Sequence, residues 1–539
     1  MDGNLLYYGD NLDVLQRYVK DESVDLVYLD PPFNSNATYN LLFAQRDGTQ
    51  AAAQIEAFED TWIWDTAASA AFHEVVTGGG AVAQVMVALQ RLLGERTDML
   101  AYLSMMAPRL LELRRVLKPT GSIYLHCDPA ASHYLKLLMD AIFHPTNFRN
   151  EIVWKRFNFH ADAHRFGRVT DRILFYTASQ EYTFNVQRAP FSAAYEAAKF
   201  THVDEAGRRY RLDNLNPPGG RGPVYEFNGV TKAWRVTREH MLELEKEGRV
   251  YTGSRVAQLK RYLDELDGQA VHELWNDIPP INPRAKERLG YPTQKPEALL
   301  ERIIEASSNE EDVVLDPFCG CGTAVAAAEG LNRRWIGIDI TYLAVGLIKK
   351  RLMEHYPGIH FDVVGAPTTT EDAKVLAESD PYQFQFWVMD LIGAGGSRKE
   401  GPDRGIDGRL FFTEGAGEAK EIIVSVKAGR LQPTFVDALL GVLQKEGAEM
   451  GALISFNEPT RAMREIAASA GFYESSGWGK FPRLQLRTVT ELLAGKDIEY
   501  PRTRGANVTY KRAQAKQVSG GDQLALVAEG EPDEPYETP

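Results

Sequence analysis

Cysteine is scarce in this chain, with 3 residues among 539. Two of them, Cys319 and Cys321, lie close together, and an odd total with this spacing does not make a disulfide framework. The composition fits a reducing compartment, so we expect a cytoplasmic protein. The sequence also lacks an apolar run of about eighteen residues and a leading signal pattern, so neither a membrane span nor secretion is expected.

Basic residues are also in deficit, with 60 Lys and Arg against 74 Asp and Glu and a formal net charge of −14. This excess of acid argues against a nucleic-acid partner for the chain as a whole. The charge is uneven, however, because residues 149–261 contain 20 Lys and Arg but 13 Asp and Glu, a local balance of +7. Any nucleic-acid contact is expected in this segment. The length allows two to four domains, and the hydrophobic and charged fractions, 44% and 25%, are typical of soluble globular proteins.

One short stretch, Asp30-Pro31-Pro32-Phe33, follows an apolar run over 24–29 that predicts a buried strand. Two prolines cannot continue a strand ladder, so the chain leaves the sheet in a stiff loop, at the edge where open α/β sheets bind ligands. The Asp30 carboxylate and the proline carbonyls can accept hydrogen bonds from an exocyclic amino group, and Phe33 offers a face for ring stacking. Taken alone, such a stretch is more often a plain exit from a strand.

A second stretch makes a ligand site the better interpretation. Residues 313–316 predict a strand, and a glycine loop over 317–323 leads into an alanine-rich helix. The next predicted strand, 335–339, ends on Asp339, and this layout can cradle a nucleoside and hold its ribose hydroxyls. The Lys-Ser/Thr pair of a phosphate-binding loop is absent after the last glycine. Because no second Cys or His pair lies near Cys319 and Cys321, we interpret them as small packing residues rather than metal ligands.

These two stretches together resemble the amino-directed DNA methyltransferases of restriction-modification systems, which methylate adenine N6 or cytosine N4. Asp30–Phe33 resembles the catalytic motif, residues 316–323 resemble the cofactor motif, and their order resembles the beta-type permutation. Residues 8–15, 115–126 and 291–296 resemble three further motifs, so the resemblance spans roughly residues 1–365. Residue 291 is Tyr where the family usually has His.

The resemblance implies an α/β fold with a Rossmann-like, S-adenosylmethionine-dependent methyltransferase sheet. It implies direct in-line transfer to a flipped base of double-stranded DNA, with S-adenosyl-L-methionine as cofactor and no metal for methyl transfer. The implied catalytic residues are Asp30, Pro31, Pro32 and Phe33. The implied cofactor-binding residues are Asp10, Thr293, Lys295, Asp316, Pro317, Phe318, Gly320, Gly322, Thr323 and Asp339. A Pro-Cys nucleophile motif is absent, which argues against methylation at cytosine C5.

The methyltransferase domain is predicted over 1–366, with a helical insertion at 41–107 and a target-recognition region at 150–275. The insertion contains Trp62 and Trp64, which we interpret as a small satellite core, with an aromatic surface near DNA as the alternative. Residues 156–166 interleave basic and aromatic side chains, a composition that suits either phosphate and base contacts or a solvated loop. Arg208, Arg209 and Arg211 cluster within the target-recognition region.

Residues 367–380 predict a linker, 381–502 a second and smaller α/β domain, and 503–539 a disordered tail. Asp407, followed by a strand that ends on Lys427, resembles the restriction-endonuclease-like fold of Mrr-type nucleases. In that fold the Asp and a Glu or Gln two places before the Lys bind Mg²⁺. Ser425 occupies that place here, which puts cleavage in doubt, so Mg²⁺ is expected only if the second domain is an active nuclease.

Two alternatives remain open from the sequence. The methylated nitrogen could be cytosine N4, or a nitrogen in RNA or protein, although Asp rather than Ser at position 30 favours adenine N6. The chain could also be a bifunctional restriction-modification protein whose second domain cleaves DNA. A homodimer or a complex with a restriction subunit is possible with either.

Overall fold

The computed structural model describes residues 3–32, 37–44, 50–60, 64–157, 164, 166–254, 256–282, 284–289, 291, 293–396, 406–412, 414, 420–475 and 477–501. In the part of the chain that it describes, no helix is long and apolar enough to cross a membrane. Phe33, Trp62 and the predicted tail at 503–539 lie outside the described residues.

A nine-stranded sheet forms the centre of the molecule, in the order β16-β6-β7-β5-β2-β17-β18-β1-β19. Its strands in chain order are β1 (Asn4–Tyr8), β2 (Val24–Leu29), β5 (Leu117–Cys127), β6 (Phe148–Lys155), β7 (Thr170–Thr177), β16 (Leu274–Trp275), β17 (Val313–Asp316), β18 (Arg334–Asp339) and β19 (Phe361–Val364). The pairs β2–β17, β17–β18 and β1–β18 are parallel, whereas β7 runs antiparallel to β5 and β6. Because β2 and β17 are parallel neighbours, the loops that follow them leave the sheet side by side.

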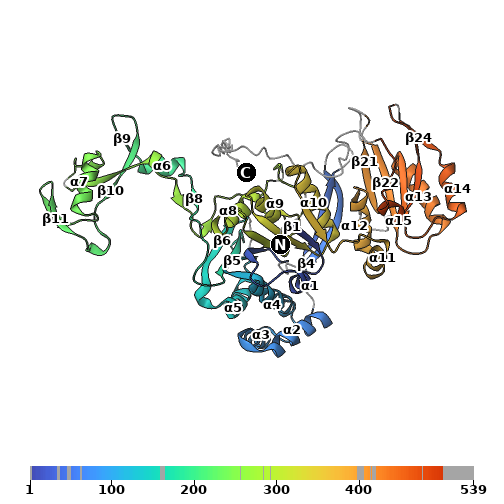
Figure 1. Ribbon diagram of the computed structural model, residues 1–539, viewed down its shortest axis with the longest axis horizontal. Coiled ribbons are helices and arrows are strands. Elements are labelled where there is room, and N and C mark those ends of the chain that lie inside the picture. Colours follow the sequence, from blue (N-terminus) through green and yellow to red (C-terminus); the bar gives the residue numbers. More distant parts are fainter. Residues whose placement is uncertain are drawn as a thin grey trace.

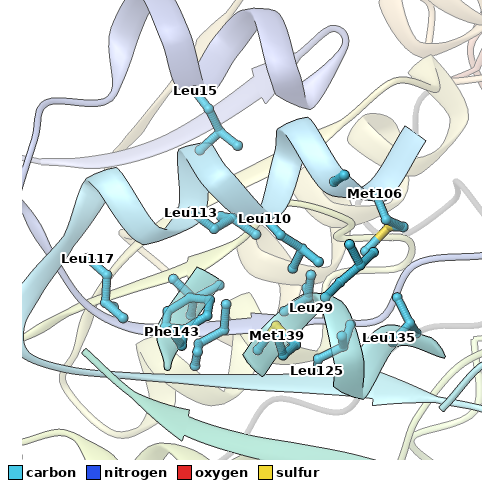
Figure 2. Close-up of a cluster of buried hydrophobic side chains, with 14 of the residues drawn as sticks. Leu15, Leu29, Met106, Leu110, Leu113, Leu117, Leu125, Leu135, Met139 and Phe143 are labelled. Carbon is cyan, nitrogen blue, oxygen red and sulfur yellow. The ribbon is translucent and has the colours of Figure 1, made fainter. Parts of the chain in front are cut away.

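Helices cover both faces of this sheet. On one face lie α1 (Asn11–Tyr18), α4 (Asp98–Val116) and α5 (Ser132–Phe143), and on the other lie α8 (Glu297–Ser307), α9 (Thr323–Gly330) and α10 (Tyr342–His355). In α4 the buried residues Met106, Leu110 and Leu113 recur at helical spacing and point at Leu29 and Leu125 of the sheet (Figure 2). The periodic pattern of apolar residues therefore determines which side of α4 faces β2 and β5.

The insertion at 41–107 is only partly helical, so this prediction was wrong in its first half. It contains the antiparallel hairpin of β3 (Ala37–Ala44) and β4 (Gln50–Asp60) before α2 (Thr66–Gly78) and α3 (Gly80–Leu93). Strand pairing overrode a composition rich in Ala and Gln, which by itself disfavours strands. Gly79 separates α2 from α3 and has φ +74°. Trp64 packs against Phe72 with ring centroids 5.8 Å apart, and both pack against the main core of the first domain and not in a separate satellite core.

Residues 188–270 form a lobe that projects away from the central sheet (Figure 1). The short antiparallel pair β8 (Arg188–Ala189) and β15 (Gln269–Ala270) joins the two chain segments at its base. Beyond it lie α6 (Ala193–Lys199), β9 (His202–Val203), β10 (Arg209–Asn214), β11 (Val224–Phe227), β12 (Val230–Ala233), α7 (Arg238–Lys246), β13 (Val250–Tyr251) and β14 (Gln258–Tyr262). The described part of the lobe also contains the 3₁₀ turns η2 (Pro218–Gly220) and η3 (Leu263–Glu265), and a further one, η1 (Pro145–Asn147), follows α5 in the first domain. The lobe has a core of its own around Trp234.

The second domain is built on the sheet β20-β21-β22-β23-β26. Its elements are α12 (Pro381–Leu391), β20 (Gly395–Gly396), β21 (Gly408–Phe412), β22 (Lys420–Lys427), α13 (Pro433–Glu446), β23 (Met450–Ser455), α14 (Arg461–Ser469), β24 (Phe472–Ser475), β25 (Gly479–Pro482), β26 (Leu484–Thr488) and α15 (Val489–Leu493). A central sheet with helices on its two faces agrees with the predicted small α/β unit.

The segment 367–380 is not a linker, which corrects the sequence-based prediction. It contains α11 (Thr370–Ser379), begun by a capping box in which Thr369 and Asp372 bond reciprocally. Ala373 and Ala377, one helical turn apart, are buried in the core of the second domain.

The two domains share that core, because α12 packs on α10 of the first domain. Tyr342, Leu343 and Leu347 of α10 belong to the same buried cluster as residues of α12 and of the second sheet. Polar contacts reinforce the packing: the Lys349 ammonium lies 2.7 Å from the Asp390 carboxylate. The second domain is thus anchored on the helix that follows β18.

Candidate active site

A cavity of about 670 Å³ opens where the loops after β1, β2, β17 and β18 meet the segment 291–295. It is lined by nearly all the residues that the sequence predicted: Asp10, Asp30, Pro31, Pro32, Thr293, Lys295, Asp316, Pro317, Phe318, Gly320, Thr323 and Asp339. Gly322 is not in the lining. It begins α9 with φ +73°, and a Cβ there would lie 2.7 Å from Ile348, so its role is to let the loop turn against α10.

Asp30 is held by an ion pair with Lys295, whose side chain is 7% exposed. The ammonium bonds to Oδ2 and also to the carbonyl of Thr293 at 3.4 Å. The other carboxylate oxygen of Asp30, Oδ1, is buried and has no hydrogen-bond partner among the described residues. A buried acceptor without a donor is costly. This loop therefore presents an acceptor that suits an amino group entering the cavity.

Asp339 anchors the glycine loop from the end of β18. Its Oδ2 accepts a hydrogen bond from the Gly320 amide at 2.8 Å, and its Oδ1 accepts two from the amide and hydroxyl of Thr341 at 2.9 and 2.8 Å. A carboxylate can accept about four hydrogen bonds, so one position is left for a ligand. Gly320 has φ +52°, and a Cβ there would lie 3.2 Å from the buried Tyr291 ring. The loop can approach Tyr291 this closely only with glycine.

Negative charge exceeds positive charge in the cavity. Asp30, Asp316 and Asp339 face it with Lys295, and burial of Asp316, together with the nearby Asp30 and Asp339 carboxylates, raises the pKa of Asp316 to about 8. A hydrogen bond from the Phe318 amide at 3.0 Å opposes this rise. A cationic ligand would favour the ionised form of all three acids.

Asp10 lines the cavity, but its carboxylate is already engaged. It caps α1 through the Leu12 amide at 2.7 Å and forms a bidentate pair with Arg109 of α4. Its neighbour Asn11 donates to the Pro317 carbonyl at 2.8 Å and accepts from Arg109 at 2.6 Å. The sequence-based reasoning missed Asn11 and Arg109, which tie the first motif to the cofactor-motif loop. Only the place of Asn11 within the first motif could have signalled it.

Two further parts of the lining were also missed. The first turns of α2 contribute Ala67, Ala68 and Ala71, and β2 contributes Tyr28. The alanines come from an insertion whose sequence carries no recognisable motif, and Tyr28 reads simply as part of a buried strand. The cavity wall thus includes residues that no pattern connected to it.

The clustered arginines of the projecting lobe form ion pairs within the lobe. Arg208 bonds to Asp264 and Glu265 at 2.7–2.9 Å, and Arg211 lies 3.1 Å from Asp213. These guanidinium groups therefore help to hold β10 and its neighbours together. The basic loop at 156–166 falls largely outside the described residues.

In the second domain Asp407 lies beside Ser425 and Lys427, as the resemblance implied. Its Oδ2 accepts hydrogen bonds from the Val426 amide at 2.6 Å, from Ser425 Oγ at 3.2 Å and from Lys427 Nζ at 3.4 Å. Among the described residues, no group of three or more His, Cys, Asp or Glu side chains is arranged to hold a metal ion. Oδ2 of Asp407 is thus already bonded to donors on β22.

The fold and the cavity define a Rossmann-like domain in which a buried, unpartnered carboxylate oxygen lies in the same cavity as a glycine loop. Residues 24–350 match the sequence model of the family described as DNA methylase (N6_N4_Mtase), and this is more than half of the chain. The chain therefore belongs to this DNA methylase family. Residues 382–493 match the family described as NACHT-associated inactive Restriction Endonuclease 1, in agreement with the predicted endonuclease-like domain.

Individual relatives point the same way. The chain is 31% identical over 261 residues to the Type II methyltransferase M.EcaI of Enterobacter cloacae, covering 47% of this chain and 57% of the relative. It is 28% identical over 354 residues to the Mod subunit of the Type III restriction-modification enzyme StyLTI of Salmonella typhimurium, covering 61% and 50%. It is 26% identical over 387 residues to the DNA adenine methyltransferase YhdJ of Escherichia coli, covering 70% and 94%. The chain thus spans about half the length of the first two relatives.

Proposed function

We propose that this protein is a site-specific DNA methyltransferase that transfers a methyl group from S-adenosylmethionine to the exocyclic N6 of adenine in duplex DNA. The observation that carries the proposal is the buried, unpartnered Oδ1 of Asp30 in the same cavity as Asp339 and the Gly320 loop. An acceptor for an amino group and a nucleoside-binding loop are what transfer to a base requires.

The cavity residues fit S-adenosylmethionine, which supplies a methyl group bonded to a positively charged sulfur. Asp339 keeps an acceptor position that would suit the ribose hydroxyls, and Thr293 and Lys295, which also line the cavity, are proposed to hold the methionine end. The excess of carboxylates over ammonium groups in the lining suits the sulfonium charge. Asp10, which is bonded to Arg109, would contact the donor only through the share of its carboxylate that remains exposed.

Asp30 would activate the acceptor nitrogen. The lone pair of an exocyclic amino group is delocalised into the ring, so the nitrogen is a poor nucleophile. Hydrogen bonds from its protons to Asp30 Oδ1 and to the Pro31 carbonyl favour a pyramidal nitrogen and free the lone pair. The nitrogen is inaccessible within a duplex, so the base is flipped into the cavity, where Phe33 would stack on it.

Adenine is the proposed base because a carboxylate, rather than a hydroxyl, begins the catalytic loop, and cytosine N4 is the alternative. The relative YhdJ is named a DNA adenine methyltransferase, which supports adenine. Transfer of a labelled methyl group to unmethylated genomic DNA, followed by nucleoside analysis, tests both points. Label in N6-methyladenine supports the proposal, label in N4-methylcytosine supports the alternative, and no label in DNA contradicts both.

The projecting lobe is proposed to bind the DNA. Most of the lobe lies in the segment 149–261, although its own residues 188–270, with 14 Lys and Arg against 12 Asp and Glu, have a balance of only +2, and it extends from the protein body as a separate arm (Figure 1). Because Arg208 and Arg211 are paired within the lobe, other basic residues would contact phosphates, among them the exposed Arg221 and Arg235. A restriction subunit or a second copy of the chain remains a proposed partner.

Affinity for S-adenosylmethionine should fall as the pH is lowered below about 8. Burial raises the pKa of Asp316 to about 8, so the carboxyl group of the free protein is largely protonated at neutral pH. A cationic donor favours the ionised carboxylate, so binding releases a proton, and affinity drops by up to about tenfold per pH unit. Calorimetry in buffers of different ionisation enthalpy measures this release. Asp316→Asn should abolish the release, and a pH-independent affinity of the wild-type protein would contradict the expectation.

We expect no Mg²⁺-dependent cleavage by the second domain. Asp407 is the one carboxylate of the Asp407–Ser425–Lys427 group, its Oδ2 is already bonded to donors of β22, and Ser425 replaces the second carboxylate or amide ligand that would strengthen a Mg²⁺ site. Incubation of unmethylated supercoiled plasmid with protein and Mg²⁺ checks this. Nicking that disappears in both Asp407→Ala and Lys427→Ala would show that the domain is a nuclease after all.

A further inference from the structure

A buried chain of hydrogen bonds runs from the cavity wall into the sheet. The Tyr28 hydroxyl lies 3.0 Å from His126 Nδ1, and His126 Nε2 lies 3.1 Å from Asp171 Oδ2. The three side chains come from adjacent strands of the sheet, β2, β5 and β7. Tyr28 is 2% exposed and His126 is fully buried, yet Tyr28 lines the cavity, two residues before Asp30 on the same side of the strand.

Asp171 fixes the direction of these hydrogen bonds. Burial alone would raise its pKa, but the hydrogen bond from His126 and the charges of Arg156 and Lys295 hold the pKa of Asp171 below its ordinary value. The carboxylate is therefore ionised and can only accept, so His126 donates to it through Nε2. In the relay proposed below, Nδ1 is the unprotonated ring nitrogen and accepts a hydrogen bond from the Tyr28 hydroxyl. The lone pairs of the Tyr28 oxygen are not used in this bond, and Tyr28 is among the residues that line the cavity.

The His126 ring is also fixed by its surroundings. The Trp154 ring packs edge-on against it, with centroids 5.9 Å apart and planes at 89°, and the Trp154 Nε1–H is satisfied by the Ile278 carbonyl at 3.0 Å. Arg156 lies 3.6 Å from the second oxygen of Asp171. A satisfied polar chain of this kind rigidifies the strands that it joins and holds the Tyr28 hydroxyl in one place. Asp30, which is ion-paired with Lys295, accounts for binding of the amino group. It does not explain which group accepts the proton that the amine loses after methylation.

We propose that Tyr28 accepts this proton, with His126 and Asp171 as positioning residues; the inference rests on the proposed methyl transfer. As the new N–C bond forms, the C–S bond of the donor breaks, and the sulfur keeps the electron pair. The methylated amine then carries a positive charge and gives one N–H proton to the Tyr28 oxygen. In the same event the hydroxyl proton of Tyr28 passes to His126 Nδ1. The resulting imidazolium is stabilised by the Asp171 carboxylate, and its extra proton returns to solvent after product release.

This relay exchanges protons through Tyr28 without forming a phenolate. Burial, with the charges of Asp30, Asp316 and Asp171, raises the pKa of Tyr28 well above its ordinary value, so the hydroxyl stays protonated between turnovers. The arrangement of hydroxyl, imidazole and carboxylate is similar in logic to a nucleophile–base–carboxylate triad, but here the hydroxyl passes a proton instead of attacking.

Single-turnover transfer of labelled methyl from S-adenosylmethionine to unmethylated genomic DNA tests the relay. Tyr28→Phe should lower the rate about 100-fold, the size of a general-base contribution, and leave the donor Kd within twofold. Tyr124→Phe is the matched control: it is also a buried tyrosine, 2% exposed, on the adjacent strand, but its hydroxyl bonds Ser307 and does not line the cavity. This control should transfer at the wild-type rate.

The Asp171→Asn variant tests whether Asp171 acts by orienting His126 and Tyr28 and not only by supporting the fold. The amide would donate to His126 Nε2, which moves the imidazole proton to Nδ1 and turns the Tyr28 hydroxyl toward the cavity as a donor. The rate should fall as in Tyr28→Phe, and the double variant should be no slower than Tyr28→Phe alone, because Asp171 acts only through Tyr28. Tyr28→Phe within threefold of wild type, or additive effects in the double variant, would overturn the relay. A wild-type protein that transfers no methyl group overturns the proposed function, and the relay with it.

Discussion

Asp30→Ala should lower the single-turnover rate of methyl transfer about 1,000-fold, the largest effect expected from any one side chain of this protein. The substitution removes the acceptor oxygen that faces the amino group and leaves the ammonium of Lys295, 7% exposed, without its main partner. An Asp30→Asn variant keeps the shape of the side chain and should lose nearly as much, because the charge is what polarises the amino protons. Transfer of labelled methyl to unmethylated DNA measures both variants.

The control for Asp30 is Asp25, at the other end of the same strand. Asp25 pairs with Lys118 at 2.7 Å and accepts a hydrogen bond from the Val313 amide at 2.9 Å, so it is also an acid paired with a lysine beside β17. Asp25→Ala should lower stability but leave the rate per folded molecule unchanged. If Asp30→Ala retained a tenth of the wild-type rate, the assignment of the catalytic loop would be wrong.

Asp339→Ala should weaken binding of S-adenosylmethionine about 100-fold. The carboxylate accepts hydrogen bonds from the amides of Gly320 and Thr341. Hydrogen bonds to a charged group contribute about 1.5–3 kcal/mol each. Removal of the carboxylate therefore takes away a ribose acceptor and also loosens the glycine loop. Calorimetric titration with S-adenosylmethionine measures the equilibrium dissociation constant and hence the loss of affinity.

Asp362 offers a comparison for Asp339 in the same sheet. It lies on β19, beside β1, and is exposed to solvent outside the cavity. Asp362→Ala should bind the donor as the wild-type protein does. Equal affinities for Asp339→Ala and Asp362→Ala would contradict a role for Asp339 in the cofactor site.

Much of the site could be predicted because local sequence determines where its loops lie. The prolines at 31–32 end a strand, glycines at 320 and 322 permit a turn with positive φ, and both turns follow apolar strands. Once β2 and β17 are parallel neighbours, the two loops must lie at one edge of the sheet. The helix α8 over 297–307 also follows from local sequence, since its apolar residues keep helical spacing.

The residues that were missed reach the site through tertiary contacts. Arg109 lies 99 residues from Asp10, and nothing in the sequence of α4 distinguishes its Arg109 from a surface arginine. The helix over 370–379 has a local signal, the capping box formed by Thr369 and Asp372. The run of threonines and acids at 368–372 nevertheless favoured a linker. Phe33, the fourth residue of the catalytic motif, lies outside the described residues, so its stacking role stays a prediction.

The docking of α12 on α10 bears on how the enzyme could be divided. Gly346 lets the two helices approach so closely that a Cβ there would lie 3.0 Å from Asp390 Oδ1. Leu343 and Leu347 belong to the buried cluster that α10 shares with the second domain, so removal of that domain would expose apolar side chains of α10 to water. We therefore expect the two domains to unfold in one cooperative transition.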